Sequence, residues 1–425
     1  MKKTGRHLFQ ASLMIAAGLL LVFILAIFSD VLYWDRYLRA YTFNTFVEHP
    51  FPTVDRLYPQ ETVRGAAAPF SFPYAEAQSR TISSAALDKA AAFAEASDST
   101  SLIVSHKGII QLERYWKGEG PAQVVYSFSM HKSIVALLVG IAVNEGHIDS
   151  IDDPLAEYLP EWQGDPREQI TLRHVLQMNS GLQPMSFPRN PFSKHVKRQI
   201  GTDLAGVALS FRRQDEPGSV FSYNGVNPTL LVMVLERATG QRYAAYLSEK
   251  LWQPVGNEDA SVWLDRPGGL ARGATSLYAK PMDWLRIGQL LLNEGWANGV
   301  QIIPEDWLEQ VTTPSPTNPR YGLLTWIGTD YVEQRTLEAF KGFAAIAETP
   351  FDAGDIIYFD GLGGQRVYVI PSADLVIVRT GVLAWEWNDS RLPNLVLAGL
   401  AGAAAESVTG VTATHRSTPR QAEHE

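Results

Sequence analysis

Cysteine is absent from this chain of 425 residues. Its absence excludes disulfide bonds, catalysis by a thiolate and zinc sites built from cysteine. An excess of basic residues is also missing, because 36 lysines and arginines stand against 45 aspartates and glutamates and the formal net charge is −9. Since nucleic-acid binding needs basic side chains that neutralise phosphates, we expect no nucleic-acid partner. The sequence shows no spacing typical of metal ligands, and we expect no metal and no cofactor.

Charged residues are missing from one N-terminal run, Leu8 to Phe28, which follows Lys2, Lys3 and Arg6. Its length matches the roughly 20 apolar residues that cross a bilayer as a helix. The run is longer than the apolar part of most signal peptides and lacks a small-residue cleavage site, although a cleaved signal peptide stays open as the alternative. The basic flank predicts a cytoplasmic N-terminus. We therefore expect a membrane-anchored protein whose catalytic domain lies on the periplasmic or extracellular side.

The region after this run has the composition of an extended tether. It contains several prolines and no sustained hydrophobic period. The C-terminal end is polar, as is typical of disordered tails. We predict four parts, namely a membrane anchor at 1–36, a tether at 37–83, a hydrolase domain at 84–406 and a disordered tail at 407–425.

Within the long central part, helical and strand patterns occupy separate regions. The sequence predicts a helix at 84–96 and a β-hairpin at 102–116 with a two-residue turn at Lys107-Gly108. A long and mainly helical stretch follows. Strand patterns return at 355–359, 366–370 and 375–380. Strands at both ends of the region indicate one sheet assembled from both ends, and therefore an α+β fold.

Ser129 and Lys132 begin an apolar run and lie three residues apart, a spacing that places them on one face of a helix. A lysine in an apolar interior loses its proton more easily, because burial disfavours its charged form. A neutral amine beside a hydroxyl makes that hydroxyl a nucleophile, and a helix N-terminus favours the negative charge that develops when a carbonyl is attacked. The same spacing also fits a plain helix start, with Ser129 as the N-cap and Lys132 in water.

Three further segments accompany this pair in a recognisable order, and together they resemble the serine β-lactamase and penicillin-binding-protein superfamily. The likeness is greatest to the class C-like branch, with its esterases and 6-aminohexanoate-dimer hydrolases. The four segments that carry it are Ser127–Ser133, Ile170–Leu176, Pro217–Asn224 and Gly363–Pro371. The resemblance implies a β-lactamase/transpeptidase-like fold, in which an antiparallel sheet is flanked by helices and interrupted by a mainly helical insertion.

The resemblance also implies catalytic roles. Ser129 would attack a carbonyl carbon, Lys132 would help to deprotonate it, and Tyr223 would carry the proton to the leaving group. The tyrosine role requires a nearby cation to favour phenolate, which Lys132 would supply. The backbone N–H groups of Ser129 and Gln365 would form an oxyanion hole. Two alternatives stay open, because Tyr223 also fits a core aromatic and the glycines before Gln365 also fit a tight strand connection.

The substrate-binding positions depart from the pattern of the family. Gly225 stands at the third position of the family's Tyr-x-Asn or Tyr-x-Ser motif, where the family has a polar residue, so we assign that contact to Asn224. Leu362, Gly363 and Gly364 occupy the place of Lys-Thr-Gly and carry no cation. We therefore expect a preference for neutral esters or linear amides over penicillins.

The prediction is a serine hydrolase that cleaves a small-molecule ester or amide through an acyl-enzyme intermediate. Its other predicted partner is the membrane, through the N-terminal helix. Two alternatives stay open, namely β-lactamase or D-amino peptidase activity, and a catalytically silent cell-envelope binding protein of the same fold. Lys194 and Arg198, in the irregular segment 183–215, would restore an anion site if they faced the nucleophile.

Overall fold

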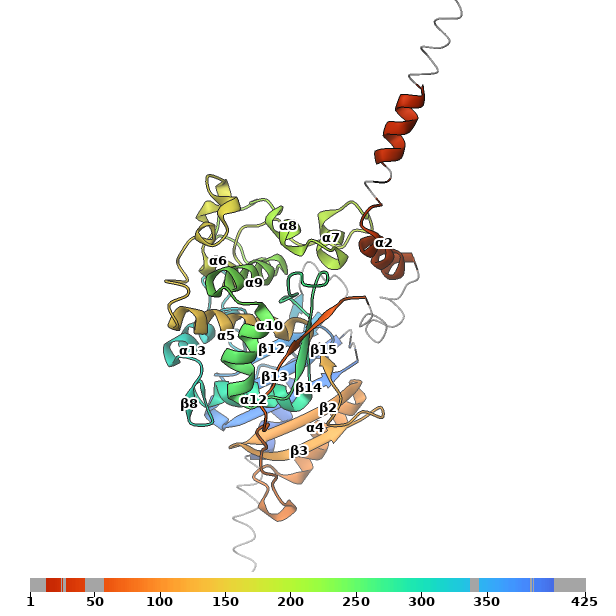
Figure 1. Cartoon of the computed structure of the whole chain (residues 1–425). Helices are drawn as coiled ribbons and strands as arrows, with labels where there is room; N and C mark the ends of the chain where they lie inside the picture. The colour runs from red at the N-terminus through yellow and green to blue at the C-terminus, as the bar shows by residue number, and fades with distance from the viewer. Residues whose placement is uncertain are drawn as a thin grey trace, which may run out of the picture.

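A six-stranded antiparallel sheet lies at the centre of the protein (Figure 1). The computed structural model describes residues 13–23, 25, 28–42, 57–336, 344–382, 384 and 386–400. In spatial order the strands are β3 (Ile109–Tyr115), β2 (Ser99–His106), β14 (Leu375–Gly381), β13 (Gln365–Ile370), β12 (Ile357–Gly361) and β9 (Trp326–Ile327). The N-terminal hairpin pairs with β14 through β2, so the prediction of a sheet assembled from both ends is confirmed.

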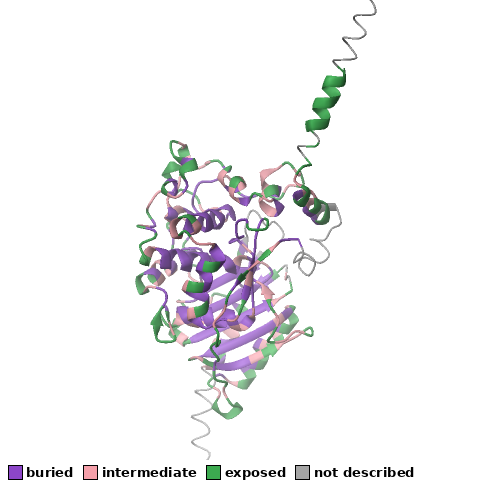
Figure 2. Cartoon of the chain, in the orientation of Figure 1, coloured by how far each residue is buried: buried purple, intermediate pink, exposed green. Residues whose placement is uncertain are grey.

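Both faces of this sheet are covered, which explains why the central strands are buried along their whole length (Figure 2). On one face, α12 (Pro281–Leu292) packs so closely that a Cβ on Gly288 would lie 2.5 Å from the side chain of Val376. On the other face, Trp387 donates a hydrogen bond to the hydroxyl of Tyr368 and lies against Phe93 of α4 (Ser84–Ala96). A helix at 391–400 packs beside α4.

The local predictions for this region are confirmed. The helix at 84–96 is α4, and the β2–β3 turn is Lys107-Gly108, with φ values of 54° and 71°. Positive φ at both turn residues is the geometry that matches the twist of a two-residue hairpin. The three late strand predictions correspond to β12, β13 and β14.

A mainly helical insertion separates β4 (Val125–Tyr126) from the late strands of the main sheet. Its centre is α5 (His131–Asn144), which packs against α9 (Val226–Thr239) and is buried on every side from His131 to Ala142. The other helices between residues 131 and 320 are α6 (Leu172–Leu176), α7 (Lys194–Ile200), α8 (Leu204–Leu209), α10 (Tyr243–Leu247), α11 (Gln253–Val255) and α13 (Glu305–Thr312).

The described residues also form three smaller sheets. One has the order β1 (Gln60–Val63), β5 (Ala260–Trp263), β6 (Leu277–Ala279) and β4 (Val125–Tyr126); the others are β10 (Gln334–Thr336), β11 (Ala344–Ile346) and β15 (Glu386–Asn388), and β7 (Trp296–Ala297) with β8 (Val300–Gln301). Short 3-10 or π turns lie at η1 (Leu38–Thr42), η3 (Ala77–Ser79), η4 (Phe128–Met130), η5 (Leu155–Glu157), η6 (Pro160–Trp162), η7 (Pro166–Gln169), η8 (Ser248–Trp252) and η10 (Pro371–Ala373).

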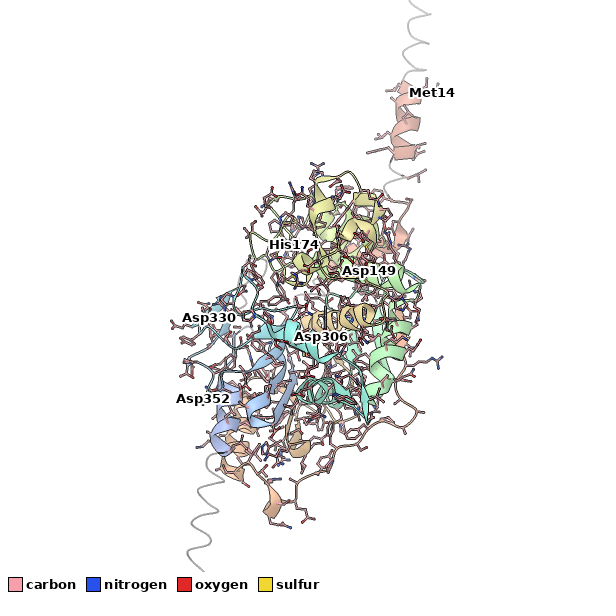
Figure 3. All side chains as sticks on the ribbon, turned by 90° about the vertical axis from the view of Figure 1, so that its left-hand side faces the viewer. Met14, Asp149, His174, Asp306, Asp330 and Asp352 are labelled. Atoms are coloured by element: carbon pink, nitrogen blue, oxygen red, sulfur yellow. The ribbon has the colours of Figure 1, made fainter. Side chains whose placement is uncertain are left out.

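The prediction of a membrane-anchored protein is contradicted. Among the residues that the structure describes, no helix is both long and apolar enough to cross a bilayer. The helix at 13–23, which carries Met14, projects from the body (Figure 3). Residues 8–12, 24 and 26–27 of the predicted span, and the predicted tail at 407–425, lie outside the described residues.

Candidate active site

Ser129 and Lys132 meet as their spacing predicts. Lys132 Nζ donates a hydrogen bond of 2.6 Å to Ser129 Oγ and a second, also of 2.6 Å, to the carbonyl of Ala274. Ser129 lies in the turn η4, directly before α5, while Lys132 is in the first turn of α5 and only 3% exposed. The alternative in which Lys132 lies in water on the first turn of the helix is therefore excluded.

The surroundings of Lys132 make it a base near neutral pH. Burial lowers its pKa to about 7, with a further decrease from the positive charge of Arg198 and an opposing increase from Asp360. Burial acts in this direction because the ammonium loses its hydration. A large fraction of Lys132 is then neutral at pH 7 and can accept the proton of Ser129.

The turn that presents Ser129 has an unusual backbone. Phe128 has φ of 48°, a left-handed conformation that is costly for a bulky side chain. The loop before β6 holds this turn, because Ser127 N–H donates to Leu277 O at 3.0 Å and Ser127 Oγ donates to Thr275 O at 3.3 Å. These contacts keep Ser129 at the N-terminus of α5, where it is half-buried.

Tyr223 reaches the same place from the segment before α9. Lys132 Nζ lies 5.0 Å from the centre of its ring. Burial, followed by the negative charge of Asp360, raises the pKa of Tyr223 well above its usual value, and an interaction with Ser129 lowers this pKa to a smaller extent. The expectation of a phenolate is therefore not met, and a protonated phenol faces the nucleophile.

The hairpin between β12 and β13 borders the nucleophile turn at Gly361. A Cβ on Gly361 would lie 2.5 Å from the carbonyl oxygen of Ser127. Gly363 and Gly364 have φ values of 79° and 80°, so both glycines serve the tight strand connection. Gln365 is 2% exposed, and its side-chain amide exchanges two hydrogen bonds, of 2.7 and 2.9 Å, with the backbone of Gly381.

Asn224 has its side chain engaged within the protein. Its Oδ1 accepts a hydrogen bond from Val226 N–H, and its Nδ2 donates to the carbonyl of Gln183, each at 3.0 Å. The side chain is 1% exposed. The space beside Tyr223 that the family fills with a polar side chain instead holds the guanidinium of Arg198, whose Nη1 would lie 2.9 Å from a Cβ on Gly225.

Behind the hairpin lies a buried ring of four charges. Asp360 bridges Arg335 at 2.6 Å and Arg366 at 2.5 Å, and Asp389 bridges the same two arginines at 2.9 and 2.7 Å. All four side chains are at most 7% exposed. Arg335 also lies 4.0 Å from the centre of the Trp326 ring, which neighbours Tyr223. Two arginines and two aspartates balance one another, so the ring adds no net charge.

Two groups of the site escaped the sequence reasoning. The carbonyl of Ala274 belongs to the backbone and leaves no trace in the residue type. Asp360 precedes Gly361 in a strand, and a lone aspartate there gave no sign of a buried partner. Arg198 was named with Lys194 as a candidate cation of the irregular segment, and its position follows from the packing of α7.

The fold and the serine–lysine–tyrosine cluster together define a class of protein, the serine hydrolases of β-lactamase/transpeptidase fold. A family model described as Beta-lactamase matches residues 88–380. The chain belongs to that family.

Relatives with assigned activities are hydrolases. The chain is 27% identical to a 6-aminohexanoate-dimer hydrolase of Paenarthrobacter ureafaciens over 66% of this chain and 71% of the relative. It is 29% identical to the esterase EstB of Burkholderia gladioli over 46% of this chain and 52% of the esterase. A solved structure from Bacillus anthracis, provisionally named a 6-aminohexanoate-dimer hydrolase, has a TM-score of 0.64 at 19% identity and covers 88% of this chain and 97% of its own. The fold prediction and the assignment as a hydrolase are thus confirmed.

Proposed function

We propose that this hydrolase cleaves an ester or a linear amide, with Ser129 as nucleophile, Lys132 as general base and Tyr223 as proton donor to the leaving group. The observation that carries the proposal is the 2.6 Å contact between Ser129 Oγ and a buried Lys132 whose pKa is lowered to about 7. Such a pair supplies both the nucleophile and its base from one helix turn.

The proposed roles account for each proton in the reaction. Neutral Lys132 accepts the proton of Ser129 as the serine oxygen bonds to the carbonyl carbon. When the tetrahedral intermediate collapses, Tyr223 gives its proton to the departing alcohol or amine, and the lysine ammonium returns a proton to the tyrosine. Water then attacks the acyl carbon and gives its proton to Lys132. When this second intermediate collapses, the bond from the acyl carbon to Ser129 Oγ breaks, the lysine ammonium returns the proton to Ser129 Oγ, and the acid is released. Because burial raises its pKa, Tyr223 starts each cycle as the phenol.

The oxyanion of the intermediate requires two backbone donors. We propose the N–H of Ser129 for one and an N–H from the β12–β13 hairpin for the other. The predicted second donor is the backbone N–H of Gln365. The close approach of Gly361 to Ser127 favours the N–H of Leu362, the next residue, as a second candidate for this role.

The substrate class rests on the relatives. One bears the name of a hydrolase of a linear amide, the 6-aminohexanoate dimer, and another is named an esterase. We extend ester and linear amide cleavage to this chain on that basis, and we assign the activity to the domain predicted at 84–406. A catalytically silent binding protein is the alternative, and the lowered pKa of Lys132 favours the enzyme.

The test is substitution of the nucleophile. Ser129→Ala should abolish covalent labelling by a serine-directed fluorophosphonate and should lower kcat/KM for 4-nitrophenyl butyrate by about 1,000-fold or more. Ser210→Ala, at an exposed serine after α8, is the matched control and should label normally. A folded Ser129→Ala protein with unchanged turnover would rule out the mechanism.

A further inference from the structure

A cavity lies at the end of the main sheet that is remote from the nucleophile. Its volume is about 390 Å³, within the range of about 300–1,000 Å³ that is usual for small-molecule sites. The β2–β3 turn at Lys107-Gly108 lines it, as does Asp374, directly before β14. β13 runs from Gln365, at the hairpin beside the active site, to Ile370, at the end near Asp374, a distance of about 20 Å at about 3.4 Å per residue. The cavity is therefore separate from the active site.

Two exposed aromatic rings line this cavity. Trp296 of β7 is 48% exposed and Phe70 is 41% exposed. Phe70 is held in position, because its N–H donates to Gly256 O at 2.9 Å and its ring packs edge-on against the buried ring of Phe72, with centres 5.0 Å apart. Large aromatic side chains in the wall of a cavity present flat apolar faces to a ligand.

Polar side chains with unused hydrogen-bonding groups surround the two rings. At the C-terminal end of α12, Gln289 Nε2 donates to Asn293 Oδ1 at 2.8 Å, which fixes the orientation of both amides. Within the described part of the chain, no hydrogen bond is made by Asn293 Nδ2, by Lys107 Nζ or by the carboxylate of Asp374. The first two groups are donors and the third is an acceptor. A ligand in this cavity therefore meets both kinds of group.

The charges around the cavity balance one another. Arg286, which is 5% exposed, donates to Phe70 O at 2.8 Å and bridges Asp283 at 2.6 Å. The other charged residues of the lining are Lys107 and Asp374, in adjacent turns joined by the hydrogen bond from Lys107 N–H to Asp374 O at 2.8 Å. An anion would be repelled by Asp374 and a cation by Lys107, so the lining favours a neutral ligand.

We propose that this cavity is a saccharide-binding site, which takes one or two uncharged pyranose rings and has no part in the hydrolysis. The C–H face of a pyranose packs against an aromatic ring, while each of its hydroxyls both donates and accepts hydrogen bonds. This combination matches the exposed rings of Trp296 and Phe70 and the mixed donors and acceptors around them. A ligand without hydroxyls would cover Lys107, Asn293 and Asp374 and leave their polar groups unpaired, which is unfavourable.

The experiment measures binding directly and needs no turnover. Maltose, cellobiose and N,N′-diacetylchitobiose are titrated into the protein and observed by saturation-transfer difference NMR, and calorimetry gives the dissociation constant. At least one of these saccharides should bind with a Kd of about 1 mM or lower. Hydrolysis of 4-nitrophenyl butyrate should be unchanged at saturating saccharide, because the cavity is separate from Ser129.

Two variants and one control locate the binding. Trp296→Ala removes an exposed ring and should raise Kd by about tenfold or more. Asn293→Ala removes a donor at an exposed position and should raise Kd by about threefold or more. Val300→Ala is the control, because Val300 pairs with Ala297 in the same hairpin, is 58% exposed and lies outside the lining. Its Kd should equal that of the wild type, and all three variants should keep the wild-type kcat/KM for 4-nitrophenyl butyrate.

Three outcomes would overturn the proposal. The first is that none of the three saccharides binds the wild-type protein at concentrations up to about 20 mM. The second is unchanged binding by folded Trp296→Ala protein, or an equal loss in Val300→Ala, which would assign the effect to the hairpin as a whole. The third is competition between the saccharide and 4-nitrophenyl butyrate, which would place the binding at the active site. None of these outcomes depends on whether Ser129 is the nucleophile.

Discussion

At the scale of single residues, Lys132 shows how strongly position governs chemistry. An exposed lysine is charged at neutral pH, with a pKa near 10.4. Here burial and Arg198 lower the pKa of Lys132 to about 7. Because the unfolded chain binds this proton more tightly, Lys132 also makes the free energy of unfolding rise with pH between about 7 and its ordinary pKa.

The shift predicts the pH dependence of activity. Lys132 is neutral above its pKa, so kcat/KM for a neutral ester should rise as the pH passes upward through about 7 and then level off. Arg198→Gln removes a cation that lowers this pKa and should move the rise to higher pH. Rate profiles from about pH 5 to pH 9 provide the measurement, with Lys197→Gln as control. A shift toward lower pH in Arg198→Gln would contradict the assignment of Lys132 as the base.

At the scale of elements, the end of β12 determines how the nucleophile turn is supported. Gly361→Ala would place a methyl group 2.5 Å from the carbonyl oxygen of Ser127, so either the strand or the turn must move. A displacement of about 1 Å in an active site costs on the order of 100-fold in rate. We expect a loss of that order in kcat/KM for 4-nitrophenyl butyrate.

Gly354→Ala is the matched control, because a Cβ on Gly354 meets nothing within 4 Å. Its activity should equal that of the wild type. Full activity in Gly361→Ala would show that the β12–β13 hairpin can move without displacing Ser129. The close contact between residues 361 and 127 would then place no constraint on Ser129.

The ring of buried charges links four parts of the chain. Asp360 lies in β12, Arg366 in β13 and Arg335 in β10, and Asp389 follows β15. Asp389→Asn leaves two buried arginines without one of their counter-charges. Breaking a buried pair in this way costs about 3–5 kcal/mol in the free energy of unfolding, which denaturant titration would measure.

The control for this substitution is an ion pair of the same chemistry on the surface. Asp152 bridges Arg173 at 2.6 Å with side-chain exposures of 63% and 34%. Asp152→Asn should cost less than about 1 kcal/mol, because water screens an exposed pair. Equal losses in the two variants would mean that burial contributes nothing to the importance of the ring.

At the scale of the whole molecule, the N-terminal residues are bound to the body. Arg36 lies in α2 (Val31–Tyr37), and its Nε donates to Leu57 O at 2.8 Å and its Nη1 to Asp265 O at 2.7 Å, besides its contacts with α7. Further along, β1 pairs with β5 in register from Gln60 to Val63. The segment predicted as a tether thus contributes a strand.

These contacts predict the effect of removing one guanidinium. Arg36→Met leaves buried carbonyl groups without their donor, and each such group costs about 1–3 kcal/mol. The free energy of unfolding should fall by several kcal/mol, measured in denaturant. Arg39→Met, at a side chain that is 54% exposed and paired with Asp35, should change it by less than about 1 kcal/mol. Similar losses in both variants would show that Arg36 does not anchor the segment.

Several features were predictable from the sequence because they depend on neighbours along the chain. The hairpin turn at Lys107-Gly108, the helix α4 and the three late strands follow from local periodicity and turn chemistry. The contact between Ser129 and Lys132 follows from helical spacing. The prediction of a membrane span, which rested on the hydropathy of the N-terminal run, is contradicted, since no helix among the described residues is both long and apolar enough to cross a bilayer.

The tertiary structure alone decided how these residues work. The pKa of Lys132 depends on burial and on Arg198, which is 66 positions away in the chain, and its second hydrogen bond goes to Ala274, 142 positions away. Asn224 and Gln365 have side chains that face other partners because packing, rather than residue type, sets their direction. Hydration and Coulomb terms act through space. The sequence by itself therefore determined the family and the contact between Ser129 and Lys132, while the fold determined the protonation state of Lys132 and the charge beside it.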